Sequence, residues 1–116
     1  MALFEYGKST KDYRYYFQLR DDNGLIILSS ARGYPDEAGC LKEIDWVKTN
    51  AREADRYRTT TGYDQLHYFE LGPTGKSEGY NASFNRDRGI EHCMMQAPGA
   101  GIRKIVPFSR FKLTDF

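Results

Sequence analysis

Two stretches of the chain carry the same landmarks in the same order, and this internal similarity constrains the fold more than any other feature of the sequence. The segment YYFQL at residues 15–19 returns as HYFEL at residues 67–71. After each comes a Gly-containing turn, a Gly-Tyr pair and a helical pattern with an Ile ten residues past the Tyr: Gly33, Tyr34 and Ile44, then Gly79, Tyr80 and Ile90. The sequence therefore predicts a single domain, residues 1–116, made of two repeats of about 1–55 and 56–116.

Alternation of apolar and polar residues predicts the strands of the first repeat. Apolar and polar residues alternate over residues 2–6. Over residues 14–20 the alternation of a pleated strand places three apolar residues on one face: Tyr15, Phe17 and Leu19. Asn23 and Gly24 favour a type I′ turn with positive φ at both positions. Residues 25–30 are therefore expected to return as an antiparallel strand.

Helical periodicity predicts one helix in each repeat. The first is expected to begin near Asp36, a good N-cap, and to carry an apolar stripe of Cys40, Leu41, Ile44, Val47 and Ala51. The second spans about residues 83–96 and ends at the segment APGAG. It is expected to bury Phe84, Ile90, Ala97 and either Cys93 or Met94.

The second repeat is expected to contain strands at residues 56–61 and 65–71 and a shortened hairpin at 72–80, and residues 102–108 alternate as a last strand. The element order is then β-β-β-α-β-β-β-α-β. Short hairpins favour antiparallel pairing, and two one-sided helices favour a sheet covered on one face. We therefore expect an α+β fold of tandem β-β-β-α repeats, with one largely antiparallel sheet and two helices on one face.

The motifs YYFQLRDDNGLIILSS, GY and EIDWVKTNA of the first repeat are followed by RYRTTT, LHYFEL and RDRGIEH in the second. In order and spacing they are similar to the repeat of the YegP-like family of small bacterial proteins of unknown function, over roughly residues 3–101. This resemblance implies a mixed-order sheet with exchanged terminal strands and two helices on one side. It implies no catalytic residue, because none is established for the family.

Composition places the chain among ordinary globular proteins, with 40% hydrophobic and 28% charged residues. The balance of 17 basic and 16 acidic residues indicates no polyanionic partner. No segment approaches the roughly 20 apolar residues of a spanning helix, and no signal-peptide pattern begins the chain. We therefore expect a cytoplasmic protein that contacts no membrane.

The chain offers few residues for catalysis or metal binding. Four residues are of the type that binds zinc: Cys40, His67, His92 and Cys93. They lack the short paired spacings that are typical of zinc sites. Both cysteines lie on apolar helix faces, where core packing is the common role. The segment GPTGKS at residues 72–77 has too few residues between its glycines for a phosphate-binding loop. We expect no catalytic residue, no metal and no cofactor.

The sheet face away from the helices is expected to be more apolar than a solvated face needs, and Tyr and Arg are common interface anchors. The leading hypothesis is a non-enzymatic protein-interaction module whose open face binds a protein partner or a second copy. The alternative is that Arg side chains and the C-terminal tail cover this face. The candidate residues are Arg14, Tyr16, Gln18, Ile27, Arg58, Tyr68 and Trp46. Trp46 is expected to lie off the helical stripe and toward solvent, where the favoured alternative is contact with the first strand or the tail and the other is contact with a partner.

A second hypothesis is single-stranded nucleic-acid binding, in which the same tyrosines stack on bases. Cations interleaved with aromatic residues near the C-terminus would assist, as in single-strand binding grooves: Arg103, Lys104, Arg110 and Lys112. The near-zero net charge argues against it. An enzyme is the third and least favoured hypothesis, since no carboxylate pair or activated nucleophile is recognisable.

Overall fold

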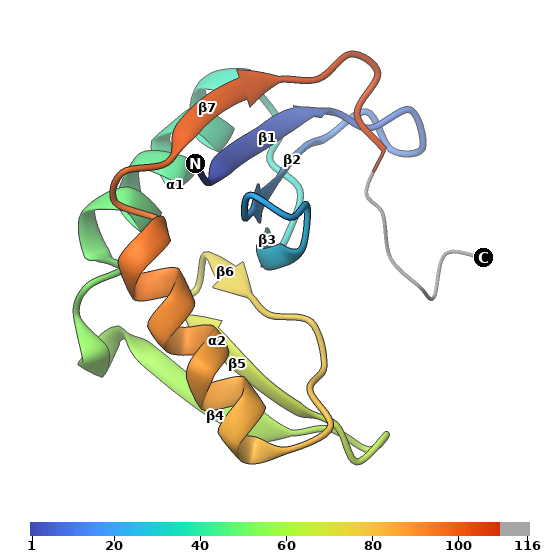
Figure 1. Cartoon of the computed structure of the whole chain (residues 1–116). Helices are drawn as coiled ribbons and strands as arrows, with labels where there is room; N and C mark the ends of the chain where they lie inside the picture. Colours follow the sequence, from blue (N-terminus) through green and yellow to red (C-terminus); the bar gives the residue numbers. More distant parts are fainter. Residues whose placement is uncertain (110–116) are drawn as a thin grey trace.

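The computed structural model describes residues 1–109 and contains seven strands and two α-helices in one sheet-and-helix body (Figure 1). The predictions for Arg110 and Lys112 concern residues outside this range. The elements in chain order are β1 (Leu3–Lys8), β2 (Tyr15–Arg20), β3 (Ile26–Ser30), α1 (Glu37–Asn50), the 3₁₀ turn η1 (Ala54–Arg56), β4 (Tyr57–Thr61), β5 (His67–Leu71), β6 (Gly75–Lys76), α2 (Ser83–Gln96) and β7 (Gly101–Lys104).

All seven strands form one mixed sheet in the order β4-β5-β6-β3-β2-β1-β7. Neighbouring strands are antiparallel except at one edge, where β7 runs parallel to β1. The strand that follows α2 thus lies beside the first strand of the chain, as Figure 1 shows. The expected α+β class, with one sheet and two helices, is confirmed.

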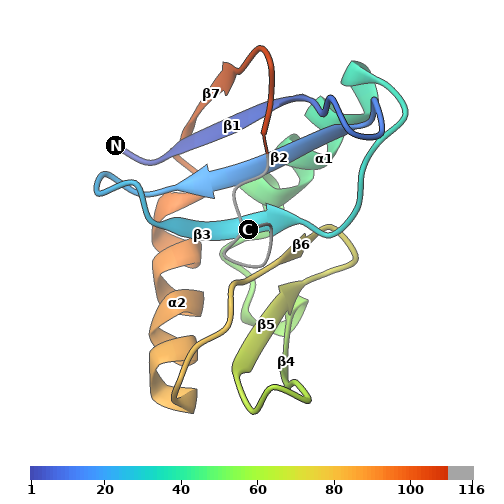
Figure 2. The same cartoon turned by 90° about the vertical axis from the view of Figure 1, so that its right-hand side faces the viewer.

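Both helices pack against the same face of the sheet. In Figure 2 the strands β1, β2 and β3 face the viewer and α1 lies behind them. One buried cluster unites the apolar stripe of α1, the buried end of α2 and the inner sheet face, with Cys40, Ile44, Val47, Cys93, Phe4, Phe17, Leu19, Leu28, Phe69 and Leu71 among its members. Within residues 1–109, neither helix is long and apolar enough to cross a membrane.

Asp36 is the N-cap of α1, as expected, and its side chain accepts a hydrogen bond from the N–H of Gly39 at 2.7 Å. The prediction for the second helix was wrong at Phe84, which is 60% exposed. Phe84 precedes Ile90 by six residues, and this spacing places it about 120° around the helix from the buried stripe. The stripe position in that turn belongs instead to Arg86, whose side chain is only 14% exposed.

The β2–β3 hairpin also departs from the prediction. Gly24 has a φ of 82°, but Asn23 is not among the residues with positive φ, so the turn is not type I′. Between Leu19 and Arg20 the register shifts, because Leu19 pairs with Leu28 whereas Arg20 pairs with Ile26. Ile27 is the extra residue of this bulge, and a bulge breaks the alternation of side chains. Ile27 is consequently buried in the core, and its expected place on the open face was wrong.

The two β-β-β-α halves make corresponding backbone contacts. The N–H of Phe17 donates to the hydroxyl of Ser30 at 3.2 Å, and the N–H of Phe69 donates to the hydroxyl of Ser77 at 2.9 Å. The Gly-Tyr landmarks also correspond, because Tyr34 bridges to the first residue of β2 and Tyr80 to the first residue of β5. Each bridge consists of two N–H to C=O bonds of 2.8 Å.

Trp46 connects α1 to the second half of the chain. Its ring lies over Gly72, so closely that a Cβ at that position would stand 2.4 Å from a ring carbon. Trp46 is half-buried and packs against the core cluster. The expectation that it points toward solvent was wrong, because the turn after β5, which is distant in sequence, comes to lie against this side of the helix.

We predict that Gly72→Ala destabilises the protein much more than Gly24→Ala does. Both glycines have positive φ, 54° and 82°, so each alanine costs about 1 kcal/mol of left-handed strain. Only the Gly72 substitution also collides with Trp46, since nothing lies within 4 Å of a Cβ at Gly24. Overpacking adds roughly 1–3 kcal/mol. Urea denaturation of the two variants measures the difference, and equal losses would contradict the packing of Trp46 on Gly72.

Candidate interaction surface

The chain itself covers part of the sheet face that points away from the helices. After β7 the backbone continues beside β1, where the N–H of Ile105 donates to Tyr6 O at 2.8 Å. Gly7 alternates with buried Tyr6 and so faces outward. A Cβ there would lie 2.2 Å from Ile105 O and 2.7 Å from the Cβ of Phe108. Phe108 is buried, so this part of the outer face is closed by the segment after β7.

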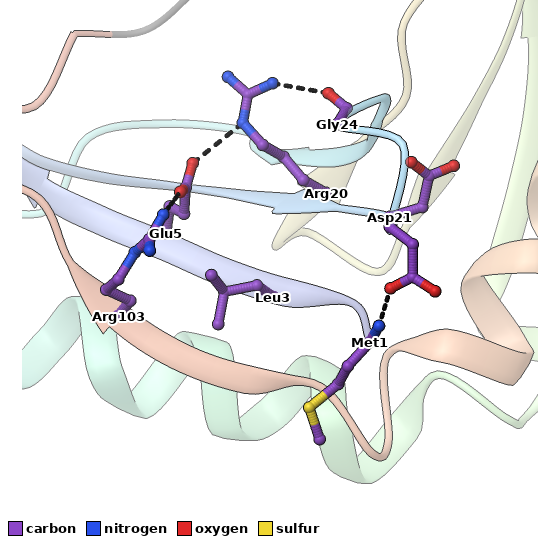
Figure 3. Close-up of a pocket in the computed structure, with 8 residues that line it drawn as sticks. Met1, Leu3, Glu5, Arg20, Asp21, Gly24 and Arg103 are labelled. Atoms are coloured by element: carbon purple, nitrogen blue, oxygen red, sulfur yellow. Dashed lines mark hydrogen bonds and ion pairs between the residues drawn. The ribbon is translucent and has the colours of Figure 1, made fainter.

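Ion pairs bridge the next part of the outer face, across β2, β1 and β7. Figure 3 shows Glu5 between Arg20 and Arg103. Its carboxylate accepts from Arg20 Nε at 2.9 Å and also from Arg103. These three residues line a hollow of about 480 Å³. Because the two guanidinium groups share one carboxylate, they are held by the protein rather than left open for an anionic ligand.

The two outward tyrosines are fastened to their own half of the chain. Tyr16 donates its hydroxyl hydrogen bond to Asp12, and Tyr68 donates in the same way to Asp64. Each ring lies against the glycine of the Gly-Tyr pair in its own half. A Cβ placed on Gly33 would lie 2.7 Å from the ring of Tyr16, and a Cβ placed on Gly79 would lie 3.1 Å from the ring of Tyr68. Both tyrosines are half-buried and have a local structural role.

These phenol contacts also affect the carboxylates. The hydrogen bond from Tyr16 is the largest influence on Asp12 and lowers its pKa, and the one from Tyr68 lowers the pKa of Asp64. Both aspartates remain charged at neutral pH and keep accepting from the phenols. The tyrosine hydroxyls are therefore engaged before any partner arrives.

The seven candidate residues of the sheet face are not brought together as one patch. Arg58 and Tyr68 are close, since β4 pairs with β5 so that Arg58 lies opposite Glu70 and Thr60 opposite Tyr68. Gln18 is buried, and Ile27 and Trp46 belong to the core and its margin. Arg14 is exposed just before β2. Among the seven, Arg58 and Tyr68 on the β4–β5 hairpin are an accessible pair that adjacent strands bring side by side, whereas Arg14 and Tyr16 lie apart from them at the start of β2.

The cations that favoured nucleic-acid binding are paired in the part of the chain that the structure describes. Arg103 is bound to Glu5, and Lys104 Nζ lies 3.1 Å from Glu37 Oε2. Glu37 also accepts from the hydroxyl of Tyr6 at 2.8 Å. Burial and this contact raise the pKa of Tyr6 to about 12, so its proton stays in place.

The free edge of β4 is an accessible feature that the sequence reasoning did not single out. β4 ends the sheet, and its residues from Arg58 to Thr61 are exposed. The N–H of Gly72 donates to Arg56 O, and the N–H of Gly62 donates to Leu66 O. These two hydrogen bonds determine which residues of β4 direct their backbone N–H and C=O groups toward β5. Because backbone groups alternate in direction along a strand, the N–H and C=O of Thr59 and Thr61 point away from the sheet, as does the C=O of Tyr57, whereas the N–H of Tyr57 donates to Ala54 O.

The two sheet edges differ in their protection. The β7 edge is short and charged, and Val106-Pro107 follows it. β4 is a five-residue strand, YRTTT, without Lys or Pro, which are common protections of an edge, and its single charge, Arg58, is paired with Glu70. The run of three threonines was the sequence signal that could have indicated this edge.

Neither cysteine is arranged for nucleophilic chemistry. Burial, with nearby Glu37 and Glu43, raises the pKa of the Cys40 thiol to about 12. Burial likewise raises the pKa of Cys93 to about 11. Both thiols are protonated at neutral pH, whereas the thiolate is the reactive form. Across residues 1–109, no group of three or more His, Cys, Asp or Glu side chains is placed to hold a metal ion.

The turn between β2 and β3 is tied to α2 by Asp21. Its carboxylate accepts from the N–H groups of Asn23 and Leu25, both at 2.9 Å. His92 Nε2 lies 3.3 Å from the other oxygen. Burial alone would raise the pKa of Asp21, but the hydrogen bonds from Leu25, His92 and Asn23 outweigh it and lower the pKa.

The architecture defines a class of small α+β proteins with a seven-stranded mixed sheet and two helices on one face, and solved structures of this class exist. The solution structure of YegP from E. coli, described as a protein of unknown function, matches with a TM-score of 0.82 at 27% identity, covering 89% of this chain and 91% of that one. The UPF0339 protein SO3888 from Shewanella oneidensis matches with a TM-score of 0.80 at 28% identity, covering 89% and 90%.

Sequence comparison identifies the family. The model of a domain of unknown function, DUF1508, matches residues 11–57. A UPF0339 protein encoded in the ptx operon 5′ region of Stutzerimonas stutzeri is 36% identical, covering 77% of this chain and 84% of the relative. The UPF0339 protein YegP of Shigella flexneri is 33% identical, covering 75% and 82%. The chain belongs to this UPF0339 family, and the predicted YegP-like membership is confirmed.

We predict that Asp21→Asn lowers stability at neutral pH by about 1 kcal/mol and that the difference disappears in acid. The folded pKa of Asp21 lies below the unfolded value of about 3.9, so its contribution is complete above that pH and is lost as the pH falls through the folded pKa. Urea denaturation from pH 7 to pH 2 measures this trend. Asp55→Asn, at an exposed carboxylate in η1, is the control and should show no such convergence.

Proposed function

We propose that this protein is a non-enzymatic association module, and that it binds a second copy of itself along the free edge of β4. The support comes from the accessible part of the predicted face: exposed Arg58 and half-buried Tyr68 adjoin that edge. The observation that carries the proposal is the outward direction of the backbone groups of Thr59 and Thr61, on a strand without Lys or Pro whose one charged side chain, Arg58, is paired with Glu70.

The two halves are also proposed to be copies of one β-β-β-α unit. Their matched serine hydrogen bonds and Gly-Tyr bridges support this relation. So do their stacked rings: Phe17 and Tyr34 lie 6.5 Å apart at 3°, and Phe69 and Tyr80 lie 6.5 Å apart at 16°. A protein assembled from two such units within one sheet is open to further strand addition at an unprotected edge.

Antiparallel pairing of two β4 strands has a preferred register. The outward groups of the two copies meet when Thr59 of one copy lies opposite Thr59 of the other, so that residue 57 faces residue 61. Arg58 then faces a threonine rather than another arginine. Its charge is already balanced, since its Nε donates to Glu70 Oε1 at 3.0 Å. Cross-strand Thr pairs are favourable, so the edge is self-complementary.

Binding, rather than catalysis, is supported by the protonated thiols and by the tyrosine hydroxyls already bound to aspartates. Protein association is favoured over nucleic-acid binding because Arg103 and Lys104 are paired with carboxylates. Contacts with phosphates would require these ion pairs to break, and the new contacts would have to offset the free energy lost with the pairs. The edge of β4 requires no such exchange.

We predict that Thr59→Lys prevents association, because the substitution places two ammonium groups directly opposite each other, about 5.5 Å apart at the Cα atoms. Sedimentation equilibrium should show a dimer for the unsubstituted protein and at least a tenfold weaker association for the variant, a loss of about 1.4 kcal/mol. Thr59 is exposed, so the fold should be unaffected. Thermal denaturation at low protein concentration checks this.

Two further variants test the register. Thr61→Lys faces Tyr57 in the proposed pairing and should dimerise almost as well as the unsubstituted protein. A mixture of Thr59→Lys and Thr59→Glu should restore a mixed dimer, since opposite charges now face each other. A monomeric unsubstituted protein at millimolar concentration would contradict the proposal, as would equal effects of lysine at positions 59 and 61.

A further inference from the structure

A hollow of about 510 Å³ lies between α2 and the beginning of β3, on the side of the molecule where the two halves meet. Its apolar lining comes from both halves: Leu25, Ile26 and Ile27 from the first, and Tyr80 from the second. The volume is in the range of small-molecule sites. A Cβ on Gly89 would lie 2.5 Å from the Tyr80 hydroxyl, so the helix approaches the tyrosine ring closely at this point.

The two helices correspond position by position, which shows why the hollow exists. Both contain 14 residues, and each α1 residue matches the α2 residue 46 positions later. The inward positions agree: Ile44 with Ile90, Val47 with Cys93 and Ala51 with Ala97. By the same spacing, Glu43 matches Gly89 and Trp46 matches His92.

In the first helix these two positions are filled by large side chains that reach the end of β5 and the turn after it. Trp46 places its ring over Gly72. Glu43 Oε1 accepts from the hydroxyl of Thr74 at 3.1 Å. In the second helix Gly89 has no side chain, and His92 is smaller than an indole. The ring of Tyr80 lies against Gly89 and takes the space that matches the Glu43 side chain, whereas the space that matches the indole of Trp46 is filled only in part by His92.

The rim of the hollow carries two charged side chains, Arg88 and Glu78. Within residues 1–109 neither the guanidinium nor the carboxylate has an ion-pair or hydrogen-bond partner, although burial raises the pKa of Tyr80 and the charge of Glu78 contributes to that rise. Asp21, by contrast, is occupied by two backbone N–H groups and His92. A ligand that meets both free groups carries a carboxylate for Arg88 and an ammonium for Glu78.

We propose that this hollow binds a free aromatic amino acid, with its ring against Tyr80 and Leu25 and its zwitterionic end at the rim. The ring takes the space that corresponds to the indole of Trp46 in the first half. Aromatic contact with Tyr80 and apolar burial supply the attraction, and the paired charges select the amino acid over a simple aromatic compound. The site is separate from the β4 edge, so the proposal of ligand binding does not depend on the proposal of self-association.

The test is an NMR titration of the isotope-labelled full chain with L-tryptophan. Saturable shifts are expected at the amides of Gly89, Ile27 and Tyr80. Three analogues test the rim: indole lacks both charges, indole-3-propionate lacks the ammonium, and tryptamine lacks the carboxylate. Each should bind at least about tenfold more weakly than L-tryptophan. Arg88→Ala should weaken L-tryptophan but leave tryptamine unchanged, whereas Arg52→Ala, at an exposed arginine outside the hollow, should change neither.

A variant that fills the hollow gives the second arm. His92→Trp restores the residue found at the matching position of α1 and should abolish L-tryptophan binding. Glu91→Trp places the same ring on an exposed neighbour and should leave the affinity within about twofold. The dispersion of the amide spectrum shows whether each variant is folded. The proposal is overturned if no saturable shift occurs at about 10 mM L-tryptophan, if indole binds as tightly, or if folded His92→Trp binds equally well.

Discussion

The burial of one phenylalanine in each half, Phe17 and Phe69, is the constraint on which the rest of the structure depends. Each ring is fully buried beneath a helix, and each N–H is bound by a serine hydroxyl. Once these rings face inward, the pleat directs their neighbours Tyr16 and Tyr68 outward. The helices must then cover the same face, because both rings belong to one cluster. The outer face, with its fastened tyrosines, is a consequence of that choice.

The differences between the halves are as informative as their agreement. Trp46 reaches from α1 to the turn after β5, and His92 reaches from α2 to the turn after β2. Each helix therefore contacts the hairpin of the opposite half, once through an aromatic ring and once through a polar pair. This exchange holds the two halves of the chain in one body and leaves them unequal. An unequal pair can hold a hollow on one side that is closed on the other.

Much of this fold could be predicted from local pattern. Alternation located β1 and β2, β-branched and aromatic residues located β4, and the N-cap at Asp36 and the stripe through Ile44 located α1. Each of these signals lies within a few residues, and the interactions that form a strand or a helix cap act over the same short distance along the chain. The parallel contact of β7 with β1 has no such local signal, since nothing in residues 101–104 specifies a partner almost a hundred positions away.

The candidate site was predicted less well, for reasons of the same kind. Strict alternation placed Ile27 outward, but a bulge that depends on pairing with β2 turned it into the core. Trp46 lies on the flank of its helix, where only the tertiary position of Gly72 decides whether it meets solvent or protein. Arg58 and Tyr68 were placed correctly relative to each other because they lie on adjacent strands of a single hairpin.

The position of β7 has a consequence for synthesis on the ribosome. The chain emerges from its N-terminal side, so β1 obtains β2 as a neighbour early but has an open second edge until residues 101–104 have been made. During translation the nascent sheet thus exposes unpaired backbone N–H and C=O groups along this edge of β1. The edge is closed when residues 101–104 pair with β1, after the other six strands have been made.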